Sequence, residues 1–146
     1  MITRIKKGAL LHILLISLAL LVPAISQAEV VIIGNKNIRV DSITTEQAKK
    51  LWLGKLKKIG GIKITVVDQT AGNPVFEAFY NRIVKKKPAQ LKAYWAKVSF
   101  TGKAFPPKQL KDDAAIIKWV ASNPDALGYV NSSAVNDSVK LLLTAK

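Results

Sequence analysis

The chain has 146 residues and a formal net charge of +14, from 23 lysine and arginine residues against 9 aspartate and glutamate residues. Such a charge favours anionic partners, whether phosphate-bearing ligands, nucleic acid, lipid headgroups or cell-wall polymers. There is no cysteine and the single histidine is His12, so thiol catalysis, zinc sites of the Cys/His kind and a Ser-His-Asp hydrolase are excluded from everything after residue 28.

Residues 1–28 have the pattern of a secretory signal peptide. Three cations precede an apolar stretch over residues 9–22, and the small residues Ser26 and Ala28 stand at the −3 and −1 positions of a cut before Glu29. A retained membrane anchor is the alternative, but the apolar stretch is short for a span of about 20 residues. No cysteine follows the cut, which excludes a lipid anchor at that position.

Residues 29–146 are expected to form one compact domain with a net charge of about +11, since this length allows one core and no second domain. Thr44 stands three residues before Gln47, which is the spacing of a capping box at the start of a helix. The helix is predicted over residues 45–53, and Gly54 is a suitable residue to end it.

The central part of the chain predicts a strand, a turn and a helix. Val30–Ile33 is an apolar run typical of a buried strand, and Ile62–Val67 is the second such strand. Asp68–Gly72 then makes a polar turn. Asn73 as N-cap and Pro74 as first residue open the next helix.

A further helix over Ala89–Val98 leads into an irregular loop over residues 100–107, which Phe100 and Phe105 are expected to pin to the domain. Asp112–Asp113 opens an amphipathic helix. A paired-carboxylate acid/base site is the alternative interpretation of these two acids, but two acids at a helix N-terminus are explained by the helix dipole.

Leu127–Val130 and Val139–Leu143 predict two more strands. Strands that alternate with helices predict an α/β fold, here a single layered domain with a mostly parallel sheet flanked by helices. Ligands of such sheets collect beyond the carboxyl ends of the strands. The turn after Val67 is therefore the default site, because a helix that starts there aims backbone N–H groups at an anion.

Four segments follow one another along the chain: Leu51-Trp52-Leu53-Gly54-Lys55, then Ile64-Thr65-Val66-Val67, then Ala93-Tyr94-Trp95 with Phe100-Thr101-Gly102-Lys103, and then Asn123-Pro124-Asp125-Ala126-Leu127-Gly128-Tyr129-Val130. In this order they resemble the phosphate-binding-protein-like family of periplasmic solute-binding domains, and above all its short members, often labelled phosphate ABC transporter substrate-binding proteins. The resemblance covers nearly all of the chain after residue 28. It implies the fold of one lobe of a type 2 periplasmic binding protein.

Full-length members of this family close two lobes on the anion, whereas this chain resembles the second lobe alone. They also carry Arg-Ser-Asp-Gly-Ser-Gly-Thr after the second strand, where this chain has Gln69-Thr70-Ala71-Gly72-Asn73-Pro74. Without the arginine and the hydroxyls, the resemblance implies weak anion binding in place of tight phosphate capture. The candidate ligand-binding residues are Gln69, Thr70, Gly72 and Asn73, helped by Thr101, Gly102 and Lys103.

The leading hypothesis is an exported, periplasmic solute-binding-like protein that binds phosphate or another oxyanion weakly for an ABC transporter or a sensor in the membrane. The alternative is a non-catalytic interaction module of the same fold, without a small ligand. Its basic surface would then dock an acidic protein or an anionic envelope surface. That surface includes Lys49, Lys50, Lys55, Lys57 and Lys58.

Neither hypothesis involves an enzyme, a cofactor or a metal. The carboxylates of Asp68 and Glu77 flank the turn, but the helix dipole accounts for Glu77. Nucleic-acid binding is disfavoured, because the lysines are dispersed and the only arginines after residue 28 are Arg39 and Arg82. A homodimer would be one way to supply the missing lobe.

Overall fold

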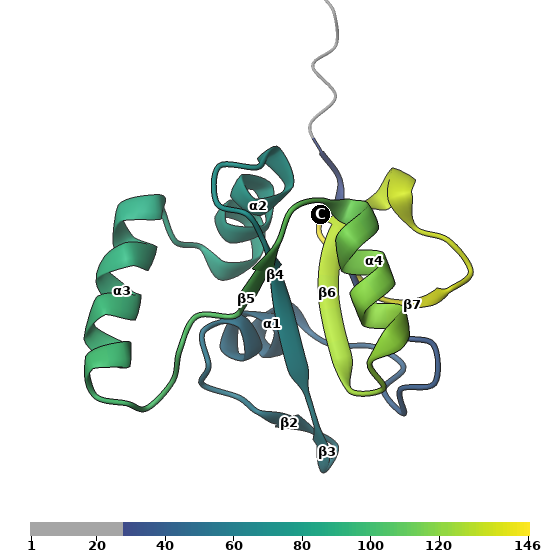
Figure 1. Cartoon of the computed structure of the whole chain (residues 1–146), viewed down its shortest axis with the longest axis horizontal. Coiled ribbons are helices and arrows are strands. Elements are labelled where there is room, and N and C mark those ends of the chain that lie inside the picture. Colours follow the sequence, from purple (N-terminus) through teal and green to yellow (C-terminus); the bar gives the residue numbers. More distant parts are fainter. Residues whose placement is uncertain (1–27) are drawn as a thin grey trace, which may run out of the picture.

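The computed structural model describes residues 28–146 (Figure 1). The expected signal peptide therefore lies outside the described residues, except for its last residue Ala28. The elements are β1 Val30–Asn35, α1 Thr45–Trp52, β2 Lys58–Ile59, β3 Ile62–Lys63, β4 Thr65–Gln69, α2 Pro74–Phe79, the π-helical turn η1 Tyr80–Val84, α3 Pro88–Phe100, β5 Lys108–Leu110, α4 Asp113–Ser122, β6 Ala126–Asn131, the 3₁₀ turn η2 Ser132–Ala134 and β7 Val139–Thr144. No helix in this part of the chain has both the length and the apolar character needed to cross a membrane.

Five strands form one sheet in the order β5-β4-β6-β1-β7. Strand β4 runs parallel to both β5 and β6, whereas β1 runs antiparallel to β6 and to β7. Four strands therefore point in one direction and only β1 opposes them. This confirms the α/β fold with a mostly parallel sheet. Strands β2 and β3 form a separate small hairpin.

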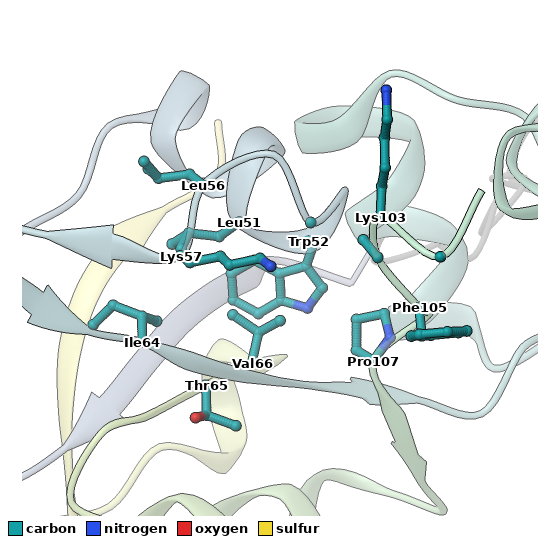
Figure 2. Close-up of a pocket in the computed structure, with 13 residues that line it drawn as sticks. Leu51, Trp52, Leu56, Lys57, Ile64, Thr65, Val66, Lys103, Phe105 and Pro107 are labelled. Atoms are coloured by element: carbon teal, nitrogen blue, oxygen red, sulfur yellow. The ribbon is translucent and has the colours of Figure 1, made fainter. Parts of the chain in front are cut away.

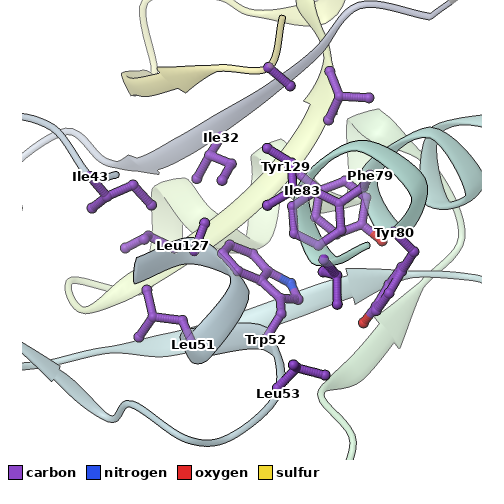
Figure 3. Packing of buried hydrophobic residues seen from close by; sticks show 14 of the residues in the cluster. Ile32, Ile43, Leu51, Trp52, Leu53, Phe79, Tyr80, Ile83, Leu127 and Tyr129 are labelled. Atoms are coloured by element: carbon purple, nitrogen blue, oxygen red, sulfur yellow. The ribbon is translucent and has the colours of Figure 1, made fainter. Parts of the chain in front are cut away.

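Helices cover both faces of the sheet, and alternate side chains of β1 enter the two cores that result. Val30 and Ile32 face α1, α2, η1 and α3, whereas Val31 and Ile33 face α4. The larger core is aromatic at its centre (Figure 3). The ring of Phe79 stacks on Tyr129 with centroids 3.8 Å apart and meets Trp52 edge-on at 4.9 Å.

The predicted helix starts are confirmed. Thr44 Oγ1 accepts a hydrogen bond from the backbone N–H of Gln47 at 3.1 Å, and Gln47 Oε1 accepts one from the backbone N–H of Thr44 at 2.9 Å. Gly54, just after α1, has φ 69°, a left-handed conformation that costs glycine least. Asn73 caps α2, as its Oδ1 accepts from the backbone N–H of Val75 at 2.9 Å.

Two strand predictions need correction. The expected strand Ile62–Val67 is interrupted at Ile64, because its first part pairs with β2 as a hairpin and only its second part joins the main sheet. The hairpin turn is made by Gly60 and Gly61, with φ values of 56° and 80°. Strand β5 was not expected, since Lys108–Leu110 is too short to show a pattern.

The prediction that Phe100 and Phe105 pin their loop to the domain is wrong. Phe100 is 94% exposed and Phe105 is 68% exposed. The loop instead packs near α1 through Ala104. If Gly54 carried a Cβ atom, that atom would lie only 2.7 Å from the Cβ of Ala104. Because Gly54 has no side chain, the loop can pack this closely against the end of α1.

Candidate functional site

The turn after β4 lies at the carboxyl edge of the parallel strands, as the sequence predicted. Thr70 donates to the carbonyl oxygen of Leu110 twice, from its backbone N–H at 3.0 Å and from its hydroxyl at 3.2 Å. The backbone N–H of Asn73 donates to Thr70 O at 3.1 Å and closes the turn. Gly72 has φ 89°, and a side chain there would meet open space. The turn is therefore fixed in shape but open to solvent.

The turn offers few hydrogen-bond donors to a ligand. Pro74 has no N–H, and the N–H of Val75 is taken by Asn73. The exposed residues Ala71 and Gly72 remain, and their backbone N–H groups have no hydrogen-bond partner among residues 28–146. Two adjacent backbone donors fit one side of an oxyanion.

Gln69 is fully buried and faces the interior. Its Nε2 donates to Tyr129 O at 3.1 Å and to Asp113 Oδ1 at 2.5 Å. Its Oε1 is buried without a hydrogen-bond donor. The side chain of Gln69 thus joins β4 to β6 and α4 beneath the turn, and does not reach the surface where a ligand would arrive.

Asp68 forms a sealed polar cluster next to the turn. Its carboxylate accepts hydrogen bonds from the Tyr80 hydroxyl at 2.6 Å, from the Tyr129 hydroxyl, and from the backbone N–H of Gln69 at 3.1 Å. Burial raises the pKa of Asp68 to about 6, against the lowering effect of these hydrogen bonds. Burial, and then the charge of Asp68, also raise the pKa of Tyr80 and of Tyr129.

The Asp68 cluster ties the end of β4 to η1 and β6. Because Asp68 is only 3% exposed and Tyr80 and Tyr129 are as deeply buried, no substrate reaches it from solvent. The cluster is therefore suited to fix the edge of the sheet and not to transfer protons to a ligand. Within the described residues no group of three His, Cys, Asp or Glu side chains is placed to hold a metal ion.

The sequence interpretation missed Lys111 as a neighbour of the turn. The register of β4 and β5 pairs Gln69 with Leu110, so Lys111 follows beside Thr70. Two acids come next along the chain. Asp112 caps α4 through the N–H of Ala115 at 2.9 Å, and Asp113 accepts from the N–H of Asn131 at 3.3 Å. Lys111 could have been found only by pairing the short strand β5 correctly.

Thr101, Gly102 and Lys103 lie away from the turn. Gly102 and Lys103 line a groove of about 390 Å³ whose other wall includes Thr65 and Val66, at the start of β4 (Figure 2). The turn begins at the opposite end of that strand. The structure therefore does not bring the two sets of candidate residues into one site: Gln69, Thr70, Gly72 and Asn73 share one edge, and the later loop lines another hollow.

Apolar side chains and polar surface both line the groove, and Lys57 and Lys103 are among its lining residues. Trp52 forms its floor and donates from Nε1 to Val67 O at 3.2 Å. The side chain of Lys57 extends across the groove, whereas the side chain of Lys103 points away from it (Figure 2). A second hollow of about 290 Å³ lies against Tyr94 on the other side of the Gly54–Ala104 contact. Neither hollow is lined by residues of the turn.

No protein-family model matches the chain. Its fold does match solved structures: an ABC-type phosphate transport receptor from Vibrio cholerae (TM-score 0.62, 20% identity), a putative phosphate ABC transporter substrate-binding protein with bound phosphate from Clostridium perfringens (TM-score 0.61, 23% identity) and PstS from Borrelia burgdorferi (TM-score 0.60, 15% identity). Each match covers 79% of this chain but only 45%, 44% and 46% of the three neighbours. The chain thus spans less than half of their length, and it has the fold of a single lobe of a phosphate ABC transporter substrate-binding protein.

Proposed function

We propose that the chain is a non-enzymatic solute-binding-like protein that holds phosphate or another small oxyanion weakly at the turn Thr70–Asn73. The observation that carries this proposal is the pair of unpartnered backbone N–H groups of Ala71 and Gly72, which lie at the carboxyl edge of parallel strands. Ligands of α/β sheets collect at this edge. The fold shared with phosphate receptors supports an oxyanion as the class of ligand.

The binding is weak for a physical reason. A hydrogen bond to a charged group contributes roughly 1.5–3 kcal/mol, and the turn supplies two such donors and no arginine. The cation of Lys111 stands next to the acids Asp112 and Asp113, so these three residues together carry no net positive charge. One lobe also leaves the other side of the anion in water. We therefore expect affinities in the millimolar range.

The proposal includes export through residues 1–28 and delivery of the ligand to a membrane transporter or sensor. A second copy of the chain would complete the clamp if two turns faced each other. Light scattering with and without phosphate tests this arrangement, because a ligand held between two copies shifts the equilibrium towards the dimer.

Amide NMR titration with phosphate and with sulfate tests the site itself. We expect the amide signals of Ala71 and Gly72 to shift together, and their shifts to saturate at millimolar concentrations of the anion. Gly60 and Gly61 are matched controls, because they are exposed glycines in a turn with open space around them, but they lie in the β2–β3 hairpin. Equal shifts at the control glycines, or no shift at the turn, would contradict the proposal.

A second candidate function is a docking module without a small ligand, and the charge distribution favours it. Between Glu46 and Asp68 there are six lysines and no acid, and between Glu77 and Asp112 there are eight lysines, one arginine and no acid. A surface of this kind binds anionic partners with strong salt dependence. Binding that weakens steeply with salt and ignores millimolar phosphate would support docking over solute binding.

A further inference from the structure

The segment between Glu77 and Asp112 carries eight lysines and no acidic residue. Of the ion pairs among residues 28–146, Lys50 with Glu46 and Lys140 with Asp41, neither involves a lysine of this segment. Lys86 lies over the ring of Tyr94, 5.4 Å from its centroid, together with Lys55 at 5.7 Å. Two cations thus share one aromatic ring.

Helix α3 carries apolar residues on two opposite faces. Leu91 and Trp95 are buried in the core, whereas Ala93, Ala96 and Phe100 follow one another along the outer side and are all exposed. A surface helix normally has polar residues on its outer face. The outer stripe of α3 is therefore arranged for a second contact, outside the domain.

Lysines border this outer stripe, and the loop after α3 extends it. At 100° per residue, Lys92 and Lys97 fall on either side of Ala96 and Phe100, and both lysines are exposed. The chain then turns at Gly102 (φ 69°) and presents exposed Lys103 and Phe105. We call the seven exposed residues of this region the α3 surface. They are Lys92, Ala93, Ala96, Lys97, Phe100, Lys103 and Phe105.

We propose that the α3 surface docks on a lipid bilayer rich in anionic phospholipids, with Phe100 and Phe105 entering the headgroup region. Exposed aromatic side chains framed by lysines match the composition of helices that lie in a membrane interface. Each lysine can bury its stem and keep its ammonium group among the phosphates. The inference deepens the second proposed function and does not depend on an anion at the Thr70–Asn73 turn.

The choice of a bilayer over other anionic partners follows from the kind of cation. Protein interfaces are enriched in arginine and depleted in lysine, and planar guanidinium groups suit the specific recognition of nucleic-acid phosphates. The α3 surface has three lysines and no arginine. A second copy of the chain would bring the same positive surface and repel it. Diffuse attraction to a negative lipid surface needs only point charges at the right depth.

A local fluorescence measurement on the full chain tests the inference, because the protein has no native cysteine. Ala96→Cys places an environment-sensitive fluorophore on the α3 surface. Ala114→Cys is the matched control, since Ala114 is also an exposed alanine in a helix, but on α4, which packs on the other face of the sheet. The vesicles contain equal parts of phosphatidylglycerol and phosphatidylcholine, or phosphatidylcholine alone.

We expect a blue shift at the Ala96→Cys label on phosphatidylglycerol vesicles, no such shift at the Ala114→Cys label, and none on phosphatidylcholine. Replacing Phe100 and Phe105 together by alanine lowers partitioning at least about tenfold. Lys92→Gln and Lys97→Gln lower it about fivefold each at low salt, whereas Lys118→Gln on α4 has a smaller effect.

Two results would overturn the inference. One is the absence of a blue shift at the Ala96→Cys label on phosphatidylglycerol vesicles, and the other is an equal shift at both labels or with both lipids. Insertion through residues 1–28 would not distinguish the Ala96→Cys label from the Ala114→Cys label, so the comparison of the two labels separates it from docking through α3. A shift with polyaspartate or an oligonucleotide but not with vesicles leaves the docking function standing and removes the bilayer as its partner.

Discussion

The buried carboxylate of Asp68 makes the stability of the fold depend on pH in an unusual direction. Its pKa rises from 3.8 to about 6 on folding, mainly because of burial. Between these two values the folded chain binds the proton more tightly than the unfolded chain, so the contribution of Asp68 falls as pH rises. The shift of about two units corresponds to about 3 kcal/mol, fully present below about pH 4 and lost by about pH 7.

Asp68→Asn is the perturbation that isolates this effect. The asparagine side chain has nearly the same shape and still offers an oxygen to Tyr80 or Tyr129, but it cannot ionise. Relative to the wild type, the variant should gain about 2 kcal/mol in free energy of unfolding between about pH 4.5 and about pH 7.5. The other eight acidic residues are present in both proteins, so their contributions to the pH dependence cancel when the two free energies of unfolding are subtracted.

Urea denaturation followed by tryptophan fluorescence measures the difference, since Trp52 is fully buried beside the cluster. The slopes of the two transitions must agree for the comparison to hold. A difference that stays constant with pH would refute the reasoning. A variant that loses stability relative to the wild type as pH rises would show that the tyrosine hydrogen bonds outweigh burial and lower the pKa of Asp68.

Three further substitutions test the packing and the separation of the two proposed sites. Gly128→Ala should destabilise the protein by about 1–3 kcal/mol in urea denaturation, because the added Cβ would lie 2.6 Å from Ile116 Cγ2; an unchanged midpoint would contradict it. Gly54→Ala should lower the free energy of unfolding by a similar amount, because φ is 69° at this position and the new Cβ would clash with Ala104. Amide hydrogen exchange should then become faster in the loop over residues 100–107. Lys103→Gln should leave the phosphate titration at Gly72 unchanged within about twofold at physiological salt.

Local chemistry explains which parts of the fold were predictable. The start of α1 followed from Thr44 and Gln47, and that of α2 from Asn73 and Pro74, because caps act within one turn of the chain. The position of the turn at the carboxyl edge of β4 also followed from the sequence, since the direction of parallel strands follows from the alternation of strands and helices.

The features that were missed depend on contacts distant in sequence. Strand β5 has only three residues, and it forms by pairing with the edge of β4. Its own sequence therefore carries no pattern that would predict a strand. For the same reason Lys111 was not placed beside Thr70. Phe100 and Phe105 were expected, on hydrophobicity alone, to pin their loop to the domain, whereas both are exposed. Gln69 was expected at the ligand but is buried, because the alternation along β4 turns it towards β6 and α4.

Lys103 of the α3 surface and the turn Thr70–Asn73 lie at opposite ends of strand β4, and this separates them electrostatically. Strand β4 has five residues, which span about 16 Å at about 3.3 Å per residue. Lys103 lines the groove at Thr65 and Val66, where β4 begins, and the turn follows its end at Gln69. The separation is about twice the Debye length of about 8 Å at physiological ionic strength. Lys103 is therefore screened from an anion at the turn, so its part in docking neither requires a bound oxyanion nor strengthens its binding.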